Sequence, residues 1–240
     1  MNKLRKKNLD LLKKSGVYHE SMEHDACGVG LVASTDGKKS RKVVEYGIQA
    51  LKAVWHRGAI DADGKTGDGA GIHIEIPSDF FIEKIEATGH KHDDSEVCVG
   101  MLFLPRNNYS AQEECRSIVE SELTKSNFNI YGWRQVPVDP SVLGETAESN
   151  RPEITQVLFK HNTKEEKGKK LEIKLYEARR KIEKKILEAN LNDFYICSFS
   201  SKSIIYKGMF LAEALSDFYF CLLYTSDAAD EGLGVDLGGR

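Results

Sequence analysis

The chain has 240 residues, of which 40% are apolar and 30% are charged, and its formal net charge is −3. This composition is typical of a globular protein, and the charge balance gives no basic field that would attract nucleic acid. No apolar run approaches the roughly 18–20 residues that a bilayer span needs, so we expect no membrane association. Residues 1–14 are basic but lack the uninterrupted apolar core of a secretory signal.

The five cysteines are spread widely along the chain. Their number is odd and no two have a C-x-x-C spacing, which argues against a disulfide framework and against a cysteine metal site. We therefore expect a reducing, cytoplasmic location and no bound metal. Cys98 and Cys197 stand inside apolar runs and are predicted to be core thiols.

The first part of the chain alternates between apolar runs and turn signals. An apolar run follows Cys27, the pair Asp36-Gly37 is typical of a turn, and a loop rich in glycine and aspartate occupies residues 57–68. The predicted elements are a buried strand over 28–34, a helix from Ser40 to about residue 55, a strand over 71–76 and a helix over 78–87.

The second part continues as strands with intervening helices. A helix is predicted over 172–189, and its apolar face is formed by Leu171, Leu175, Ala178, Ile182 and Ile186. The other predicted elements are a strand over 96–104, a helix over 110–123 opened by a capping box at Ser110, a strand over 128–138, an exposed connector over 141–151, a strand over 154–159, and a hairpin formed by 194–199 and 204–207. This order lacks strict β-α-β alternation and predicts an α+β layered domain.

The last twenty residues differ in character from the rest. Residues 221–240 show neither helical nor strand periodicity, and their first half looks like a translated sequencing-library adapter. We expect a natural domain over 27–220 followed by a non-native tail over 221–240; the alternative is a genuine, poorly ordered terminus.

Cys27 opens the glycine-spaced run Cys27-Gly28-Val29-Gly30 after 26 mostly polar residues. This arrangement suggests a leader over 1–26 whose removal makes Cys27 the first residue. Its thiol would then be the nucleophile and its α-amine the base, because a free thiol has a pKa of about 8.5 and an α-amine one of about 7.7–8.0. The competing interpretation is a buried, inert cysteine at the start of a strand.

Two further segments carry candidate substrate-binding residues. Arg57 ends the first helix, and its guanidinium could pair with the carboxylate of a small amino acid; alternatively, His56 and Arg57 bond only to the end of their helix. Gly69 lies in the tight loop over 67–71, which misses the dinucleotide-binding pattern. Gly64-Lys65-Thr66 is no phosphate loop, since Ala59 stands where that motif requires glycine.

Three motifs together resemble a known family. They are EHDACGVG over 23–30, LKAVWHRGA over 51–59 followed by Asp61-Ala62-Asp63, and TGDGAG over 66–71. In this order and spacing they resemble the amino-terminal part of the glutamate synthase large subunit. That part is a class II glutamine amidotransferase domain with the N-terminal-nucleophile hydrolase fold, an αββα layered sandwich.

The resemblance implies a reaction. Cys27 would attack the side-chain amide of glutamine, ammonia would leave, and water would hydrolyse the glutamyl thioester to glutamate. In the family, the ammonia reaches further synthase domains that use 2-oxoglutarate, FMN, an iron–sulfur cluster and, in some members, a small reductase subunit. We expect this chain to bind neither FMN nor the cluster.

The family's Arg-Phe-Ser-Thr and Asn-Gly segments, which bind the substrate carboxylate and the oxyanion, have no counterpart here. The resemblance therefore implies a domain that is incomplete at its C-terminus and inactive by itself. Two alternatives stay open: another class II amidotransferase, and a non-catalytic binding or regulatory module in which Cys27 is only a core residue.

Overall fold

Two antiparallel sheets form the centre of the described part of the chain. The computed structural model describes residues 28–54, 59–93 and 95–222. Within them, a four-stranded sheet has the order β3-β4-β2-β5 and a two-stranded sheet pairs β1 with β6. The strands are β1 (Ala70–Glu75), β2 (Cys98–Leu104), β3 (Phe128–Gln135), β4 (Glu153–His161), β5 (Tyr195–Ser200) and β6 (Ser203–Gly208).

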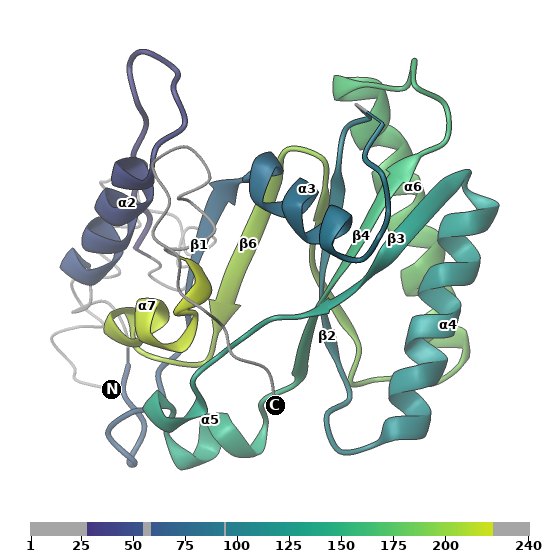
Figure 1. Ribbon diagram of the computed structural model, residues 1–240. Helices are drawn as coiled ribbons and strands as arrows, with labels where there is room; N and C mark the ends of the chain where they lie inside the picture. Colours follow the sequence, from purple (N-terminus) through teal and green to yellow (C-terminus); the bar gives the residue numbers. More distant parts are fainter. Residues whose placement is uncertain (1–27, 55–58, 94, 223–240) are drawn as a thin grey trace, which may run out of the picture.

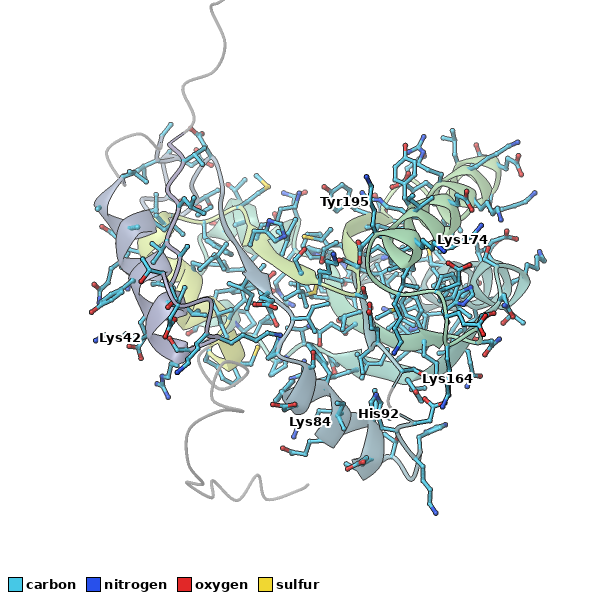
Figure 2. The ribbon with its side chains drawn as sticks, turned by 90° about the horizontal axis from the view of Figure 1, so that it is seen from above. Lys42, Lys84, His92, Lys164, Lys174 and Tyr195 are labelled. Atoms are coloured by element: carbon cyan, nitrogen blue, oxygen red, sulfur yellow. The ribbon has the colours of Figure 1, made fainter. Side chains whose placement is uncertain are left out.

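Helices flank the sheets on both outer sides. α4 (Tyr109–Lys125) and α6 (Gly168–Glu188) cover one face of the four-stranded sheet, while α2 (Arg41–Ala53) lies beyond β1 at the other side of the molecule (Figure 1). Figure 2 shows Lys42 of α2 and Lys174 of α6 on opposite sides, with the strands between them. This layering confirms the predicted α+β class and fits an N-terminal-nucleophile hydrolase-like fold.

Each face of the four-stranded sheet contributes to a separate apolar core. In β2, Cys98 and Leu102 point toward α4 and α6, whereas Val99 and Met101 join the core on the opposite face. The second core also contains Tyr206 of β6, together with residues of α3 (Ser78–Ala87) and α7 (Leu215–Phe218). Because successive side chains of a strand point to opposite faces of the sheet, the apolar residues of β2 contribute to both cores.

Most of the predicted elements are confirmed. The five predicted face residues of α6 are all buried, and the helix spans four residues more at its start than the periodicity indicated. Ser40 occupies the N-cap position of α2, although its side chain makes no capping hydrogen bond. In α4, the cap is Asn108, whose side chain accepts a hydrogen bond from the amide of Ala111 at 3.1 Å, so the prediction of a capping box at Ser110 is wrong.

The predicted strand over 28–34 is not formed. These residues have no strand assignment, and the side chains of Val29 and Leu31 are 90% and 92% exposed. An apolar run becomes a buried strand only when a sheet edge pairs with it, and within the described residues β1 pairs with β6 alone.

The predicted hairpin over 194–207 is also wrong. β5 pairs with β2, while β6 pairs with β1, so the chain crosses from one sheet to the other. The connecting turn is held to α6 by Glu172, whose carboxylate accepts hydrogen bonds from the amide of Ser201 at 2.8 Å and from the hydroxyl of Ser200 at 3.0 Å.

The segment predicted as an exposed connector over 141–151 contains regular structure. Its first two residues belong to the short helix η3 (Pro140–Val142), and it includes α5 (Glu145–Ser149), in which Ala147 is buried. Glu145 and Glu148 lie in the first turn of α5, where negative charge complements the exposed amide groups. Five residues are too few to show helical periodicity in the sequence.

Candidate active site

The nucleophile and the guanidinium predicted from the sequence, Cys27 and Arg57, both lie outside the described residues. So do the predicted leader over 1–26 and residues 223–240 of the predicted tail. Cys221 and Leu222, the first two residues of that tail, are buried in the core that lies between the sheets. The structure describes the chain that follows each of the two site residues, from Gly28 and from Ala59 onward.

A cavity of about 710 Å³ is lined by residues 28–34, which follow Cys27 in the sequence, and by residues of α2 and β1. Its walls include the apolar side chains of Val44, Leu51 and Ile72. Charged groups stand at its edge, where Lys39 pairs with Glu75 at 2.9 Å. The walls of this cavity are therefore mainly apolar, with charged groups only at the edge.

The glycine-rich loop folds as a tight hairpin over 59–68. Ile60 and Gly67 form an antiparallel bridge, and the amide of Asp61 donates to the carbonyl of Thr66 at 2.9 Å. The carboxylate of Asp68 closes the base of this hairpin by accepting a hydrogen bond from the amide of Ala59 at 2.9 Å. This contact fixes the backbone at Ala59, the first described residue after Arg57 in the sequence.

Two glycines of the loop are required by the geometry. A Cβ on Gly67 would lie 2.9 Å from the carbonyl carbon and oxygen of Phe210, closer than real Cβ contacts allow. Gly69, the predicted substrate-binding glycine, has a backbone φ of +124°, which residues other than glycine rarely adopt. In the predicted tight loop over 67–71, the close backbone approach and the positive φ are thus confirmed at Gly67 and Gly69, whereas Ala70 and Gly71 already belong to β1.

An interaction that the sequence analysis missed joins this loop to α5. The hydroxyl of Thr66 donates to Asp63 Oδ2 at 2.5 Å and accepts from the amide of Ala147 at 3.2 Å. Asp63 also accepts from the amides of Thr66 at 2.7 Å and Thr146 at 3.4 Å. The Thr66 hydroxyl and the loop amides hold the pKa of the Asp63 carboxyl well below its usual range, so this group is ionised at neutral pH. The Asp-x-x-Thr spacing was the available signal, because aspartate commonly bonds to the backbone of a following turn.

α5 is in turn fixed to the end of β2 by charged groups. Glu148 pairs with Arg106, which follows β2, at 2.6 Å and with Arg151 at 2.7 Å. The Arg151 and Arg106 guanidinium groups lower the pKa of the Glu148 carboxyl. A continuous set of polar contacts therefore runs from the four-stranded sheet through α5 to the glycine-rich loop.

The cysteines among the described residues are core thiols. Cys98, Cys115, Cys197 and Cys221 are free and buried, which confirms the core-thiol prediction for Cys98 and Cys197. Nowhere in the described ranges do three histidine, cysteine, aspartate or glutamate side chains gather as metal ligands. Among the helices that the structure describes, none combines the length and the apolarity that crossing a membrane requires.

Comparison with known families decides the membership of the chain. Residues 27–229 match the family of class II glutamine amidotransferases. The chain belongs to this family. The match begins at Cys27 and includes the glycine-rich loop, α5 and both sheets.

The curated proteins that this amidotransferase chain resembles include several glutamate synthases. It is 53% identical over 216 residues to the glutamate synthase (NADPH) large chain of Azospirillum brasilense. The aligned segment covers 90% of this chain and 14% of that protein. It is 41% identical over 201 residues to the ferredoxin-dependent glutamate synthase of Cyanidium caldarium, covering 82% of this chain and 13% of that protein. The chain thus spans about one seventh of the length of these relatives.

Proposed function

We propose that this chain is the glutaminase portion of a glutamate synthase, which hydrolyses glutamine to glutamate and ammonia. One observation carries the proposal: a class II amidotransferase match that begins at Cys27, combined with 53% identity to a glutamate synthase large chain. The similarity covers 90% of this chain, so it extends well beyond the short motifs.

In the proposed mechanism, residues 1–26 are removed and Cys27 becomes the amino terminus. Its α-amine accepts the thiol proton, and the sulfur attacks the side-chain carbonyl of glutamine to form a tetrahedral oxyanion. The α-ammonium then returns this proton to the amide nitrogen, the oxyanion collapses, the C–N bond breaks and ammonia leaves, so that a glutamyl thioester remains. Water then attacks the thioester, and release of glutamate regenerates the thiol.

Arg57 and Gly69 are the proposed substrate-binding residues. A guanidinium pairs with a carboxylate through two parallel hydrogen bonds, which suits the α-carboxylate of glutamine. Gly69 belongs to a loop whose backbone is held close to β6, and a glycine backbone lets a substrate approach closely.

The partners of this chain are proposed from its relatives. We propose that the ammonia passes to synthase domains that combine it with 2-oxoglutarate, as the name glutamate synthase implies for the relatives. FMN, an iron–sulfur cluster and a small reductase subunit would belong to those other parts. The four free, buried thiols among the described residues support a reducing, cytoplasmic location.

The test uses a chimera in which residues 1–220 of this chain replace the matching segment of the A. brasilense large chain. We expect the chimera to release glutamate and ammonia from glutamine, and Cys27→Ala to abolish this activity without lowering the melting temperature. Cys115→Ala, which changes a buried thiol in α4, is the matched control and should keep the activity.

The first residue of the active chimera tests the role of the amine. Mass spectrometry of the intact protein should show Cys27 at the amino terminus. An active enzyme that retains Met1–Ala26, or a Cys27→Ala variant that still hydrolyses glutamine, would overturn the proposed mechanism.

A further inference from the structure

We infer that Asp63 and Thr66 are positioning residues for glutamine, because they fasten the glycine-rich loop to α5 and so set its geometry. The inference rests on the proposed function and goes one step further, since it assigns substrate affinity to a contact between segments 80 residues apart. Neither residue is proposed to touch glutamine.

The first step is the contact between the loop and α5. Gly144, the N-cap residue of α5, offers no side chain to the free amides of the first turn. Thr66 accepts from the amide of Ala147 at 3.2 Å, and Asp63 accepts from that of Thr146 at 3.4 Å. A Cβ on Gly144 would lie 2.2 Å from Asp63 Oδ2, so the two segments are in close contact.

The second step leads from this contact toward the substrate-binding residues. Thr66 is 3% exposed and directly precedes Gly67, whose position is fixed by the backbone of Phe210. On the same strand, Asp68 accepts a hydrogen bond from the amide of Ala59, which lies on the opposite strand of the hairpin. Loss of the Thr66 contact would therefore displace the Gly69 backbone, three residues further along the same strand.

The third step concerns the contacts that hold α5, and through it the glycine-rich loop, in place. Glu148 links α5 to Arg106 at 2.6 Å and to Arg151 at 2.7 Å, and Arg106 follows the central strand β2. The loop is thus held to the four-stranded sheet through α5 and to β6 through Phe210. A loop held at both sides keeps its geometry when substrate binds, which favours affinity because little ordering is needed on binding.

The test compares Thr66→Val with Thr66→Ser in the chimera described above. Valine has the shape of threonine but cannot accept from Ala147 or donate to Asp63, whereas serine keeps the hydroxyl. We expect Thr66→Val to raise the KM for glutamine about tenfold, because a displacement near 1 Å can cost up to ~100-fold, with kcat changed less than about threefold. Thr66→Ser should restore the KM.

Two further variants complete the experiment. Asp63→Asn removes the charge from an exposed side chain, so it should raise the KM in the same direction without preventing folding. Thr124→Val is the matched control, because the hydroxyl of Thr124 bonds to Glu120 on the surface of α4 and should leave the KM unchanged. On the 240-residue chain itself, amide hydrogen exchange at Ala147 should be faster in Thr66→Val than in Thr66→Ser.

The outcomes separate this inference from the proposed function. An unchanged KM in both Thr66→Val and Asp63→Asn would overturn the positioning role, even if Cys27→Ala is inactive. A raised KM in Thr66→Ser equal to that of Thr66→Val would overturn it as well, since the hydroxyl would then be irrelevant. Activity that survives Cys27→Ala would instead overturn the proposed function.

Discussion

The carbonyl group of Phe210 lies 2.9 Å from the point where a Cβ would stand on Gly67. Gly67 lies in the glycine-rich loop and Phe210 follows β6, so this contact joins the candidate site to the two-stranded sheet. Both neighbouring atoms belong to the backbone and have little freedom to yield. The glycine is therefore required by packing, independently of any contact with substrate.

We predict that Gly67→Ala lowers the free energy of unfolding by about 1–3 kcal/mol, the usual range for overpacking a closely packed site. Gly30→Ala is the control, since a Cβ there would lie 3.7 Å from the Cβ of Ala50, an ordinary contact. Urea unfolding of the 240-residue chain should show a lower midpoint for Gly67→Ala than for Gly30→Ala. Equal midpoints of the two variants would contradict the close packing of Gly67 against the backbone of Phe210.

The second prediction concerns the pair formed by Asp93 and Lys160. Their charged groups lie 2.6 Å apart, and Lys164 approaches the same carboxylate from the edge where His92 also lies (Figure 2). Lys160 and the hydroxyl of Ser95 hold the pKa of Asp93 well below its usual range, and Asp93 raises the pKa of Lys160. The pair is thus ionised over a wide range of pH.

The sign of the pH dependence follows from these directions. Asp93 stabilises the fold fully above its unfolded pKa of about 3.9, and this stabilisation disappears as the pH falls through the lower folded pKa. Lys160 stabilises the fold fully below about pH 10.4, and its contribution disappears as the pH rises through the higher folded pKa. A double-mutant cycle with Asp93→Asn and Lys160→Gln should give a coupling energy of up to about 1 kcal/mol at pH 7, since Asp93 is partly exposed. A coupling energy that grows as the pH falls below 4 would contradict the predicted loss of the Asp93–Lys160 interaction at low pH.

Periodicity in the sequence predicts elements whose partners are local. The buried face of α6 from Leu171 to Ile186 was predictable, because apolar side chains that recur with the helical period form one stripe and this stripe packs against the core. The pairing of β6 was not predictable, because the turn at Ser200–Ser203 permits either a hairpin or a crossing between sheets. The bond between Glu172 and Ser201, which holds this turn to a helix 29 residues away, leaves no periodic pattern.

In the candidate site, too, the local features were predictable and the distant contacts were not. The short motifs identified Cys27, Arg57 and the glycine-rich loop, and the fold of that loop agrees with its glycine pattern. The contact between Thr66 and Ala147 joins residues 81 positions apart. It depends on α5, whose five residues carry too few apolar positions to indicate a helix. Residues that position a site through such distant contacts are therefore found from the structure.

The third prediction compares neighbouring residues of α6. Leu175 is fully buried against the sheet, whereas the side chain of Tyr176 is 64% exposed. We predict that Leu175→Ala costs about 2–5 kcal/mol of stability, because it removes buried methyl groups and leaves a cavity. Tyr176→Ala should change the stability by less than about 0.5 kcal/mol. Thermal unfolding followed by circular dichroism measures both, and similar melting temperatures would contradict the assigned orientation of the helix.

The last prediction uses the reactivity of the five thiols. Burial raises the pKa of Cys115 and of Cys197 to about 11, and it also raises the pKa values of Cys98 and Cys221. Because the thiolate is the reactive form, these four thiols should react slowly at pH 7.5 in the native chain. The proposed nucleophile Cys27 should then account for one rapidly reacting thiol per chain.

Titration with a disulfide reagent that releases a coloured thiolate measures this number directly. We expect one fast thiol in the native chain, none in Cys27→Ser and five in denaturant, where burial no longer protects the other four. The denatured count is the control, since it shows that every cysteine is reduced and available to the reagent. A native chain with no fast thiol would contradict an accessible nucleophile at Cys27, and a Cys27→Ser variant that keeps a fast thiol would mean that another cysteine leaves the core easily.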